Sequence, residues 1–168
     1  MRIELGGGSK PLGGFCNVDA VAGDGVDVVA NLELGMPFAD DSVDEVYSSH
    51  CLEHVRNVTH LLREICRACK LGAKVTIKVP HHGQEMAMCP GHVHVVSEKM
   101  VDHFSEFAAD WWVGSKRLVL QKKHYTPTAH FHEASRLFPG LSREQIYRFI
   151  QNTCHEVIFE FTVENNAH

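Results

Sequence analysis

The sequence predicts an α/β fold built on an open sheet, and three observations lead to this class. Short runs of β-branched residues recur along the chain, with turn residues between them. One stretch with helical spacing of its apolar residues separates two of these runs. The first run ends in Gly6, Gly7 and Gly8. Glycines at the end of a strand let the backbone turn sharply and approach a ligand, as in the nucleotide-binding members of this class.

The composition fits one globular domain with a sizeable core, since the chain has 168 residues of which 44% are hydrophobic. The formal net charge of −5 supplies no basic footprint, which argues against nucleic acid as a partner. No apolar run reaches the length of a membrane span, and the first residues lack a secretory pattern. We therefore expect a cytoplasmic protein with reduced cysteines.

Seven runs are predicted to be strands. They cover residues 2–5, 15–21, 26–32, 43–49, 73–80, 116–125 and 155–164. The third and fourth runs end in polar residues, as buried parallel strands do where they meet a ligand. The fifth run alternates apolar residues with lysines, which predicts one partly solvated face, and Pro80 ends it.

Three helices are predicted from spacing and capping residues. Residues 51–70 carry helical spacing, and Gly72 follows at the position of a left-handed cap, so this segment is typical of a βαβ crossover. A second helix is expected over 97–109 with Ser97 as its N-cap, and a third after Ser142.

The connections among the first three strands are too short for helices. Only residues 9–14 and 22–25 are available, whereas parallel pairs need crossovers of a dozen residues or more. We therefore expect reduced helix cover over the first strands. Either the segment 126–153 folds back over that face or a second subunit covers it, and we favour a homodimer.

A set of short motifs occurs in one order along the chain. They are Glu4-x-Gly6-x-Gly8, Asn17-Val18-Asp19, Met36-Pro37-Phe38-x-Asp40-x-Ser42-x-Asp44, Leu52-Glu53-His54-Val55, Leu71-Gly72 and Pro90-x-His92. Together they resemble the class I S-adenosylmethionine-dependent methyltransferases, in the small, type 11-like branch with a late Leu-Glu-His motif. The resemblance covers residues 1–95.

This resemblance implies a Rossmann-like, mostly parallel seven-stranded sheet with one antiparallel strand near its edge. Residues 1–168 would form a single methyltransferase-like domain. Its cofactor-binding core would span 1–95, and 96–168 would hold the C-terminal strands and a helical insertion at 126–153. Many family members have a helix before the first strand that closes over the cofactor. Because this sequence opens with that strand, we expect the lid to come from elsewhere.

The resemblance also implies that S-adenosylmethionine binds across the carboxyl ends of the first four strands, with S-adenosylhomocysteine as the product. Glu4 is expected to order the glycine loop and to lie near the methionine amino group. Gly6, Gly7 and Gly8 would let the backbone face the methionine moiety. Asp19 would accept hydrogen bonds from both ribose hydroxyls.

Four further residues complete the implied cofactor site. Asn31 stands where many family members have aspartate, and its side-chain oxygen can still accept from the adenine amino group. Leu32 would contact the adenine ring, and Ser49 and His50 would line the pocket at the fourth strand.

Methyl transfer requires alignment of the acceptor behind the methyl group, and a base where the acceptor is a hydroxyl or a protonated amine. We assign the catalytic role to His81 and His82, because they follow the fifth strand directly and histidine titrates near neutral pH. For His54 we favour a structural hydrogen bond that braces the start of its helix. The resemblance favours a small-molecule or sugar-containing acceptor, and no membrane partner is expected.

Two other functions stay open. The chain can be a metal-binding protein, since His92-x-His94, His130-x-His132, Cys89 and the His81–His82 pair supply ligands for zinc or iron. It can also be a non-catalytic binding or scaffold protein with a cofactor fold, which the asparagine at position 31 suggests. Cys66-x-x-Cys69 lies inside a helical pattern, where cysteine serves as a small apolar residue. We therefore assign no residue as a metal ligand.

Overall fold

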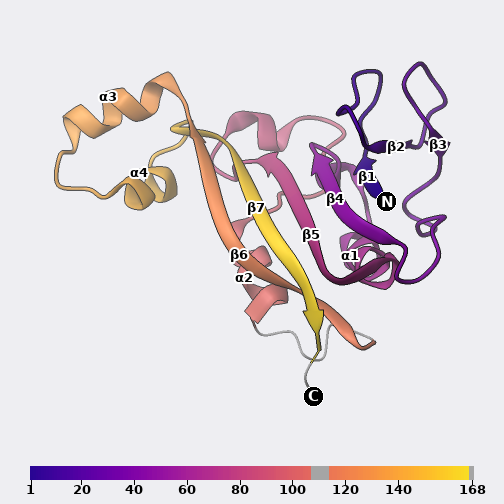
Figure 1. Ribbon diagram of the computed structural model, residues 1–168. Coiled ribbons are helices and arrows are strands. Elements are labelled where there is room, and N and C mark those ends of the chain that lie inside the picture. Colours follow the sequence, from indigo (N-terminus) through magenta and orange to yellow (C-terminus); the bar gives the residue numbers. More distant parts are fainter. Residues whose placement is uncertain (107–113, 167–168) are drawn as a thin grey trace.

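The computed structural model describes residues 1–106 and 114–166 and is organised around a seven-stranded sheet with the order β3-β2-β1-β4-β5-β7-β6 (Figure 1). Neighbouring pairs from β3 through β5 are parallel, and β7 runs antiparallel to both β5 and β6. The strands are β1 (Arg2–Leu5), β2 (Cys16–Asp19), β3 (Val28–Val29), β4 (Val43–Ser49), β5 (Cys69–Pro80), β6 (Lys116–Pro127) and β7 (Cys154–Asn165). The predicted mostly parallel sheet with one antiparallel strand near its edge is confirmed.

The helices are η1 (Leu52–His54), α1 (Val58–Ala68), η2 (Glu85–Met88), α2 (Glu98–Glu106), α3 (Ala129–Leu137) and α4 (Arg143–Phe149). The predicted helix over 51–70 is thus divided into η1 and α1. It ends earlier than predicted because Cys69 pairs with Val43 in the β4–β5 ladder. Gly72 has the expected positive φ of 80° but lies inside β5 and caps no helix.

Two predicted N-caps are confirmed. The Ser97 hydroxyl accepts a hydrogen bond from the Met100 N–H (3.2 Å) at the start of α2. Ser142 forms a capping box with Gln145 at the start of α4. Residues 107–109 of the predicted second helix lie outside the described residues.

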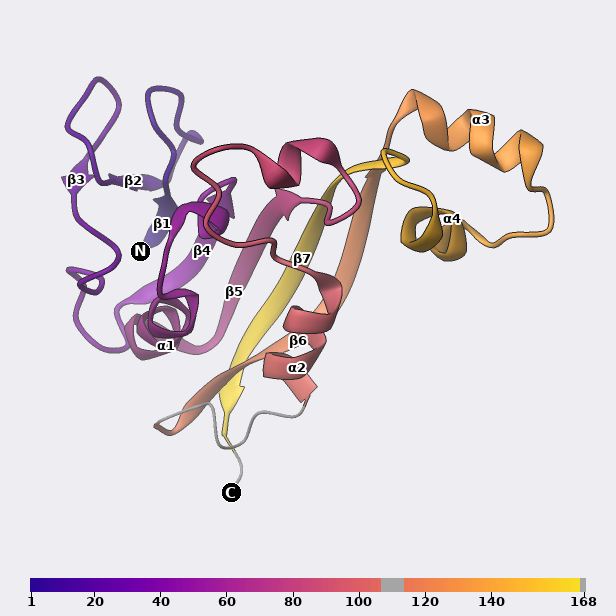
Figure 2. The ribbon, with the colours of Figure 1, turned by 180° about the vertical axis from the view of Figure 1, so that it is seen from behind.

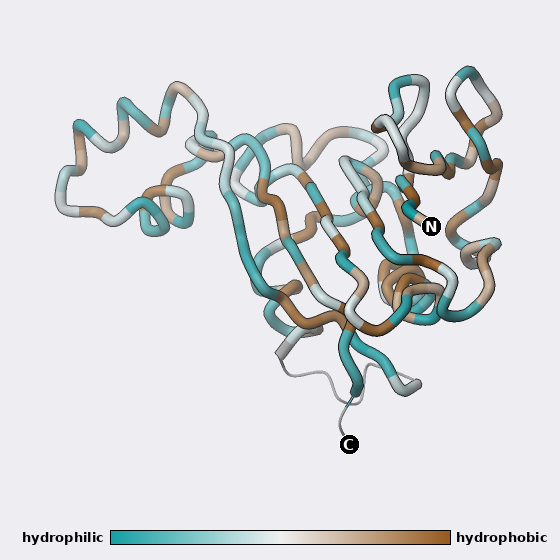
Figure 3. Tube along the Cα trace, in the orientation of Figure 1, coloured by the Kyte–Doolittle hydropathy of each residue, from teal (hydrophilic) through white to brown (hydrophobic). Residues whose placement is uncertain are grey.

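Both α1 and α2 lie on one face of the sheet, as the two opposite views show (Figures 1 and 2). The residues of β5 that face them are buried and apolar, such as Val75 and Ile77, and they alternate with the more exposed Lys74, Thr76 and Lys78. Figure 3 shows this alternation along the strand. The partly solvated face predicted for this strand is confirmed.

The loops 6–15 and 20–27 contain no helix, so the reduced helix cover predicted around the first strands is confirmed. The segment 126–153 does not fold back over these strands, contrary to one of our expectations. Its helices α3 and α4 join β6 to β7 at the opposite edge of the sheet, because those two strands pair with each other there (Figures 1 and 2). The rings of Tyr125 and Tyr147 stack 5.0 Å apart and attach this segment to the sheet.

Among the described residues, no helix has the length and apolarity needed to cross a membrane.

Candidate functional site

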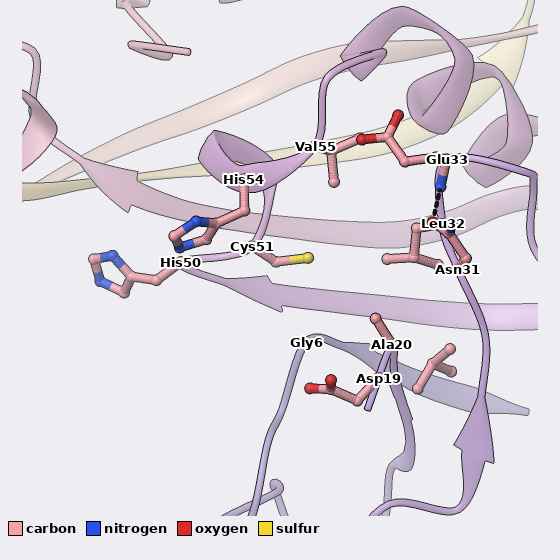
Figure 4. A pocket seen from close by; sticks show the side chains of 11 residues that line it. Gly6, Asp19, Ala20, Asn31, Leu32, Glu33, His50, Cys51, His54 and Val55 are labelled. Atoms are coloured by element: carbon pink, nitrogen blue, oxygen red, sulfur yellow. Dashed lines mark hydrogen bonds between the residues drawn. The ribbon is translucent and has the colours of Figure 1, made fainter. Parts of the chain in front are cut away.

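A cavity of about 320 Å³ lies where β1, β2 and β4 end and where the chain leaves β3 (Figure 4). Its lining residues are Gly6, Val18, Asp19, Ala20, Asn31, Leu32, Glu33, His50, Cys51, His54 and Val55. The structure therefore brings together five of the residues predicted to bind the cofactor, namely Gly6, Asp19, Asn31, Leu32 and His50. Glu4, Gly7, Gly8 and Ser49, which were predicted with them, are not lining residues.

The glycine loop closely approaches the neighbouring strand end. Gly6 has a φ of +73°, and its N–H donates to the Val18 carbonyl oxygen (2.8 Å). A Cβ atom at Gly6 would lie 2.8 Å from the Cβ atom of Cys51, closer than real carbon atoms pack. Only glycine fits here, both for its backbone conformation and for its size.

Two buried polar side chains hold the loops that follow β1 and β2. Glu4 is 4% exposed, and its carboxylate accepts a hydrogen bond from the Leu12 N–H (2.6 Å). Asn17 donates from its amide nitrogen to the carbonyl oxygens of Gly8 (2.8 Å) and Gly25 (2.7 Å). Glu4 thus braces the loop 6–15, which begins with the glycines. The motif that contains Asn17 was visible in the sequence, but its bridging role between two loops was not.

Asp19 lies at the end of β2 and presents its carboxylate beside Gly6 (Figure 4). One oxygen accepts from the Gly8 N–H and the other from the Val21 N–H, both at 3.1 Å. These bonds fix the side chain. Since each carboxylate oxygen has more than one acceptor position, both oxygens retain capacity for a ligand hydroxyl.

The segment after β3 forms a second wall of the cavity. Leu32 is buried and apolar, whereas Asn31 is exposed and accepts from the Glu33 N–H through its side-chain oxygen (3.0 Å). The Glu33 carboxylate accepts from the backbone N–H groups of Arg56 (2.6 Å) and Asn57 (3.2 Å). Sequence reasoning missed Glu33, because its partners lie more than twenty positions away in the chain.

His50 stands at the carboxyl end of β4 in the left-handed conformation, with a φ of 52°. A non-glycine residue in this region is uncommon and is held there by its surroundings. Its Nδ1 lies 3.2 Å from a Glu53 oxygen, and its Nε2 lies 3.1 Å from a Glu156 oxygen. The hydrogen bond with Glu53 raises the pKa of His50, and the hydrogen bond with Glu156 adds a smaller effect in the same direction. Lys78 also pairs with Glu156 (3.0 Å).

Cys51 contributes its side chain to the cavity next to His50 (Figure 4). Burial raises the pKa of this thiol to about 12, and the nearby Glu53 carboxylate acts in the same direction. The group is therefore a neutral thiol near pH 7, which makes it a poor nucleophile.

His81 and His82 follow β5, and neither of them lines this cavity. His81 is 1% exposed, and its Nδ1 accepts a hydrogen bond from the Gly83 N–H (3.1 Å). Burial, assisted by the charge of His82, lowers the pKa of His81 to about 4. His82 lines a second cavity of about 350 Å³, where its Nδ1 lies 3.9 Å from a Glu98 oxygen.

The comparisons with known proteins agree with this fold. Residues 17–77 match the family model described as a methyltransferase domain. No curated protein matches the sequence.

Many solved structures are similar to this chain, at low sequence identity. A SAM-dependent methyltransferase from Archaeoglobus fulgidus has a TM-score of 0.64 at 13% identity, with 96% of this chain and 85% of that chain covered. The YcgJ protein from Bacillus subtilis has a TM-score of 0.60 at 16% identity, with 97% of this chain and 91% of that chain covered. A SAM-dependent methyltransferase from Aquifex aeolicus has a TM-score of 0.56 at 16% identity, with 96% and 81% covered.

The sheet order, the cavity at its carboxyl edge and these structural neighbours define a class I methyltransferase fold. The matched segment carries the methyltransferase-domain pattern through β2, β3, β4 and most of β5. The resemblance to the class I S-adenosylmethionine-dependent methyltransferases is thereby confirmed.

Proposed function

We propose that this chain binds S-adenosylmethionine in the cavity at the carboxyl ends of β1 to β4 and transfers its methyl group to a small or sugar-containing acceptor. The observation that carries the proposal is the convergence of Gly6, Asp19, Leu32 and His50 on one cavity. These residues come from four strand ends, and the fold binds ligands at this edge of the sheet.

The lining suggests an orientation for the cofactor. The Asp19 carboxylate is the acceptor pair suited to a ribose diol, because it lies at the end of β2 with its orientation fixed by two backbone N–H groups. Leu32 and Val55 offer apolar surface for a purine ring, with Asn31 and Glu33 as polar partners at its edge. The methionine end would then lie against Gly6, where the absence of a side chain leaves backbone groups accessible.

The cofactor supplies a sulfonium methyl group, which is electrophilic without further activation. The protein must align the acceptor and exclude competing water, which for ideal alignment is worth about 7–11 kcal/mol. In the transfer, a bond forms between the acceptor atom and the methyl carbon, while the electron pair of the carbon–sulfur bond stays on sulfur. A hydroxyl or ammonium acceptor also gives up a proton.

The base for that proton remains a prediction. His82 is the better placed of the two predicted residues, because it lines an open cavity together with Ser97, Lys123 and Tyr125. The Nδ1 of His81 is already occupied by the Gly83 N–H, and that side chain is buried. His50 is the histidine that both lines the cofactor cavity and contacts two carboxylates, so it is the comparison residue for any test of the base.

The partner assignments also remain proposals. We retain a small-molecule acceptor and a homodimer, and the division of the chain into a cofactor-binding core and a C-terminal part. In support of that division, all lining residues of the cofactor cavity fall before position 56.

The test is a calorimetric titration with S-adenosylmethionine and, separately, with S-adenosylhomocysteine. We expect one site per chain with micromolar affinity. Asp19→Ala should weaken binding by about 1–3 kcal/mol, since hydrogen bonds to a buried ribose diol are lost. Asp24→Ala is the matched control, because Asp24 is exposed and outside the cavity. Equal affinity for both variants would contradict the proposed site, and binding without any turnover would favour the scaffold interpretation.

A further inference from the structure

We infer that Glu53, His54 and His92 form a binding site for one divalent transition-metal ion at the rim of the cofactor cavity. One candidate ligand atom from each residue lies within 4.8 Å of the others. The rings of His54 and His92 have their centroids 4.7 Å apart with an interplanar angle of 82°. Two imidazoles and one carboxylate form a donor set that leaves coordination positions open.

Glu53 provides an unsatisfied buried oxygen. The residue is 1% exposed, and its Oε2 has no hydrogen-bond partner among the described residues. Its Oε1 accepts from His50 Nδ1 (3.2 Å), which fixes the orientation of the carboxylate. A buried carboxylate oxygen without a partner is costly, and a bound cation would remove that cost. The His50 contact is the kind of outer hydrogen bond that orients a metal-binding carboxylate.

Each of the two histidines has a ring nitrogen free to bind an ion. His54 donates from Nδ1 to the Gly91 carbonyl oxygen (3.0 Å), so the lone pair of its neutral ring is on Nε2. This arrangement is typical of metal-binding histidines, whose second nitrogen donates to a backbone carbonyl. The Nδ1 of His92 is buried and has no partner among the described residues.

The ligands are held in place before any ion binds. The Val93 N–H donates to the Glu53 carbonyl oxygen (2.8 Å), and His94 Nε2 donates to the Arg56 carbonyl oxygen (2.7 Å). These bonds, with that between His54 and Gly91, tie the loop that carries His92 to the segment 53–56. The site therefore needs little rearrangement to accept an ion.

A second group, His81, His82 and Glu98, has similar distances but a less suitable arrangement. His81 Nδ1 accepts from the Gly83 N–H, so the proton of the neutral ring is on Nε2. Glu98 accepts a short hydrogen bond from the Tyr125 hydroxyl. His81 Nδ1 and the Glu98 carboxylate thus have hydrogen-bond partners within the protein, whereas His81 Nε2 and His82 Nδ1 have none among the described residues.

The metal site predicted as an alternative from the sequence had a different composition. Of its residues, His92 alone belongs to the group proposed here. The Nε2 atom of His94 already donates to the Arg56 carbonyl oxygen. His130 and His132 lie on α3, at the opposite edge of the sheet from β1 to β3.

The position of the ion also indicates the class of acceptor. This step rests on the proposed function. His54 belongs to both the metal group and the cavity lining, so an ion held there would lie beside the cavity. An acceptor hydroxyl bound there would have its pKa lowered. Its proton would pass to the proposed base or to solvent, its oxygen electron pair would form the bond to the methyl carbon, and the carbon–sulfur pair would remain on sulfur. The site therefore favours a hydroxyl acceptor over an amine.

The test is a titration of the full chain with Co²⁺, followed by visible absorption and by equilibrium dialysis with metal analysis. We expect one Co²⁺ per chain and a cobalt-dependent rise in the unfolding temperature. His92→Ala should weaken binding by at least about 100-fold, since even outer residues of metal sites cost 10–100-fold. The matched control His82→Ala removes a histidine of the second group and should bind like the wild type.

Glu53→Gln can fail to fold because Glu53 is buried, so the test uses His92→Ala and His54→Ala. Thermal unfolding of the metal-free variants shows whether they are folded. No Co²⁺ binding by the wild type, or unchanged binding by both variants, would overturn the site. Binding lost in His82→Ala instead would assign the ion to the second group and also overturn it. Binding of S-adenosylmethionine without binding of Co²⁺ would refute the metal site alone. Binding of Co²⁺ without binding of S-adenosylmethionine would refute the proposed function alone.

Discussion

Gly6 and Cys51 approach each other so closely that a Cβ atom at Gly6 would lie 2.8 Å from the Cβ atom of Cys51. This contact joins the end of β1 to the residue two positions after β4. Both residues line the cavity, so the contact fixes the spacing between two of its walls.

Gly6→Ala is expected to lower both the free energy of unfolding and the affinity for S-adenosylmethionine. The alanine would clash with Cys51 and would hold a φ of +73°, and such strain alone costs about 1–3 kcal/mol. Urea unfolding and calorimetry measure the two effects. The control is Gly23→Ala, since a Cβ there meets nothing within 4 Å. If both variants resembled the wild type, the proposed close contact would be wrong.

Glu4→Ala should destabilise the chain by about 2 kcal/mol, because the Leu12 N–H loses the charged acceptor that the buried Glu4 supplies. The glycine loop would become less ordered, so affinity for the cofactor should also fall. Glu133→Ala, at an exposed position on α3, should leave both quantities unchanged. A normal cofactor affinity in Glu4→Ala would show that the loop does not depend on this brace.

His81 predicts a pH dependence of stability. Its pKa is about 4 in the folded chain and near 6.5 when unfolded, so the unfolded state binds more protons between these values. The stability that depends on a neutral His81 is therefore fully present above pH 6.5, and it is lost as the pH falls towards 4. Between pH 7 and pH 5 it amounts to about 2 kcal/mol.

The measurement is the pH profile of urea unfolding for the wild type and for His81→Gln. The difference between the two should shrink as the pH falls from 7 to 5. His132→Gln, with its exposed side chain, should follow the wild-type profile. Parallel profiles for the wild type and His81→Gln would show that His81 is not held neutral by burial.

Cys51→Ala should retain most of the methyl transfer activity, with kcat within about tenfold of the wild type, because loss of a covalent nucleophile costs far more. Since the pKa of this thiol is about 12, iodoacetamide at pH 8 should modify it only after unfolding. Peptide mass mapping measures the modification. Rapid labelling of Cys51 in the folded chain would contradict its assignment as a neutral thiol with a raised pKa.

His82→Ala should lower kcat while the calorimetric affinity for the cofactor stays unchanged, if His82 removes the acceptor proton. His50→Ala provides the comparison, because His50 lines the cofactor cavity and its loss should reduce affinity as well. Normal turnover in His82→Ala would remove this residue from the base role.

The fold was predictable from the sequence wherever local patterns determine it. The alternation along β5, the glycines after β1 and the capping residues Ser97 and Ser142 each act over a few positions. The end of α1 at Ala68 was not predictable, because pairing of Cys69 with Val43 decides it. The position of α3 and α4 depends likewise on the pairing of β6 with β7.

In the candidate site too, some residues could be predicted from local sequence, whereas others are positioned by contacts between distant parts of the chain. Asp19 ends β2 and Leu32 lies three positions after β3, so their positions in the cavity could be inferred. The contact of His50 with Glu156 spans 106 positions, and no local signal indicates it. His92 was visible as part of a motif, but its proximity to His54 arises only from the hydrogen bonds that hold its loop.

The most direct test of the central claim is a crystal structure of the chain with S-adenosylhomocysteine. Our account predicts that the ribose hydroxyls lie within hydrogen-bond distance of the Asp19 carboxylate, with the adenine ring against Leu32. A ligand bound elsewhere, or one bound in the cavity without contact to Asp19, would contradict the account.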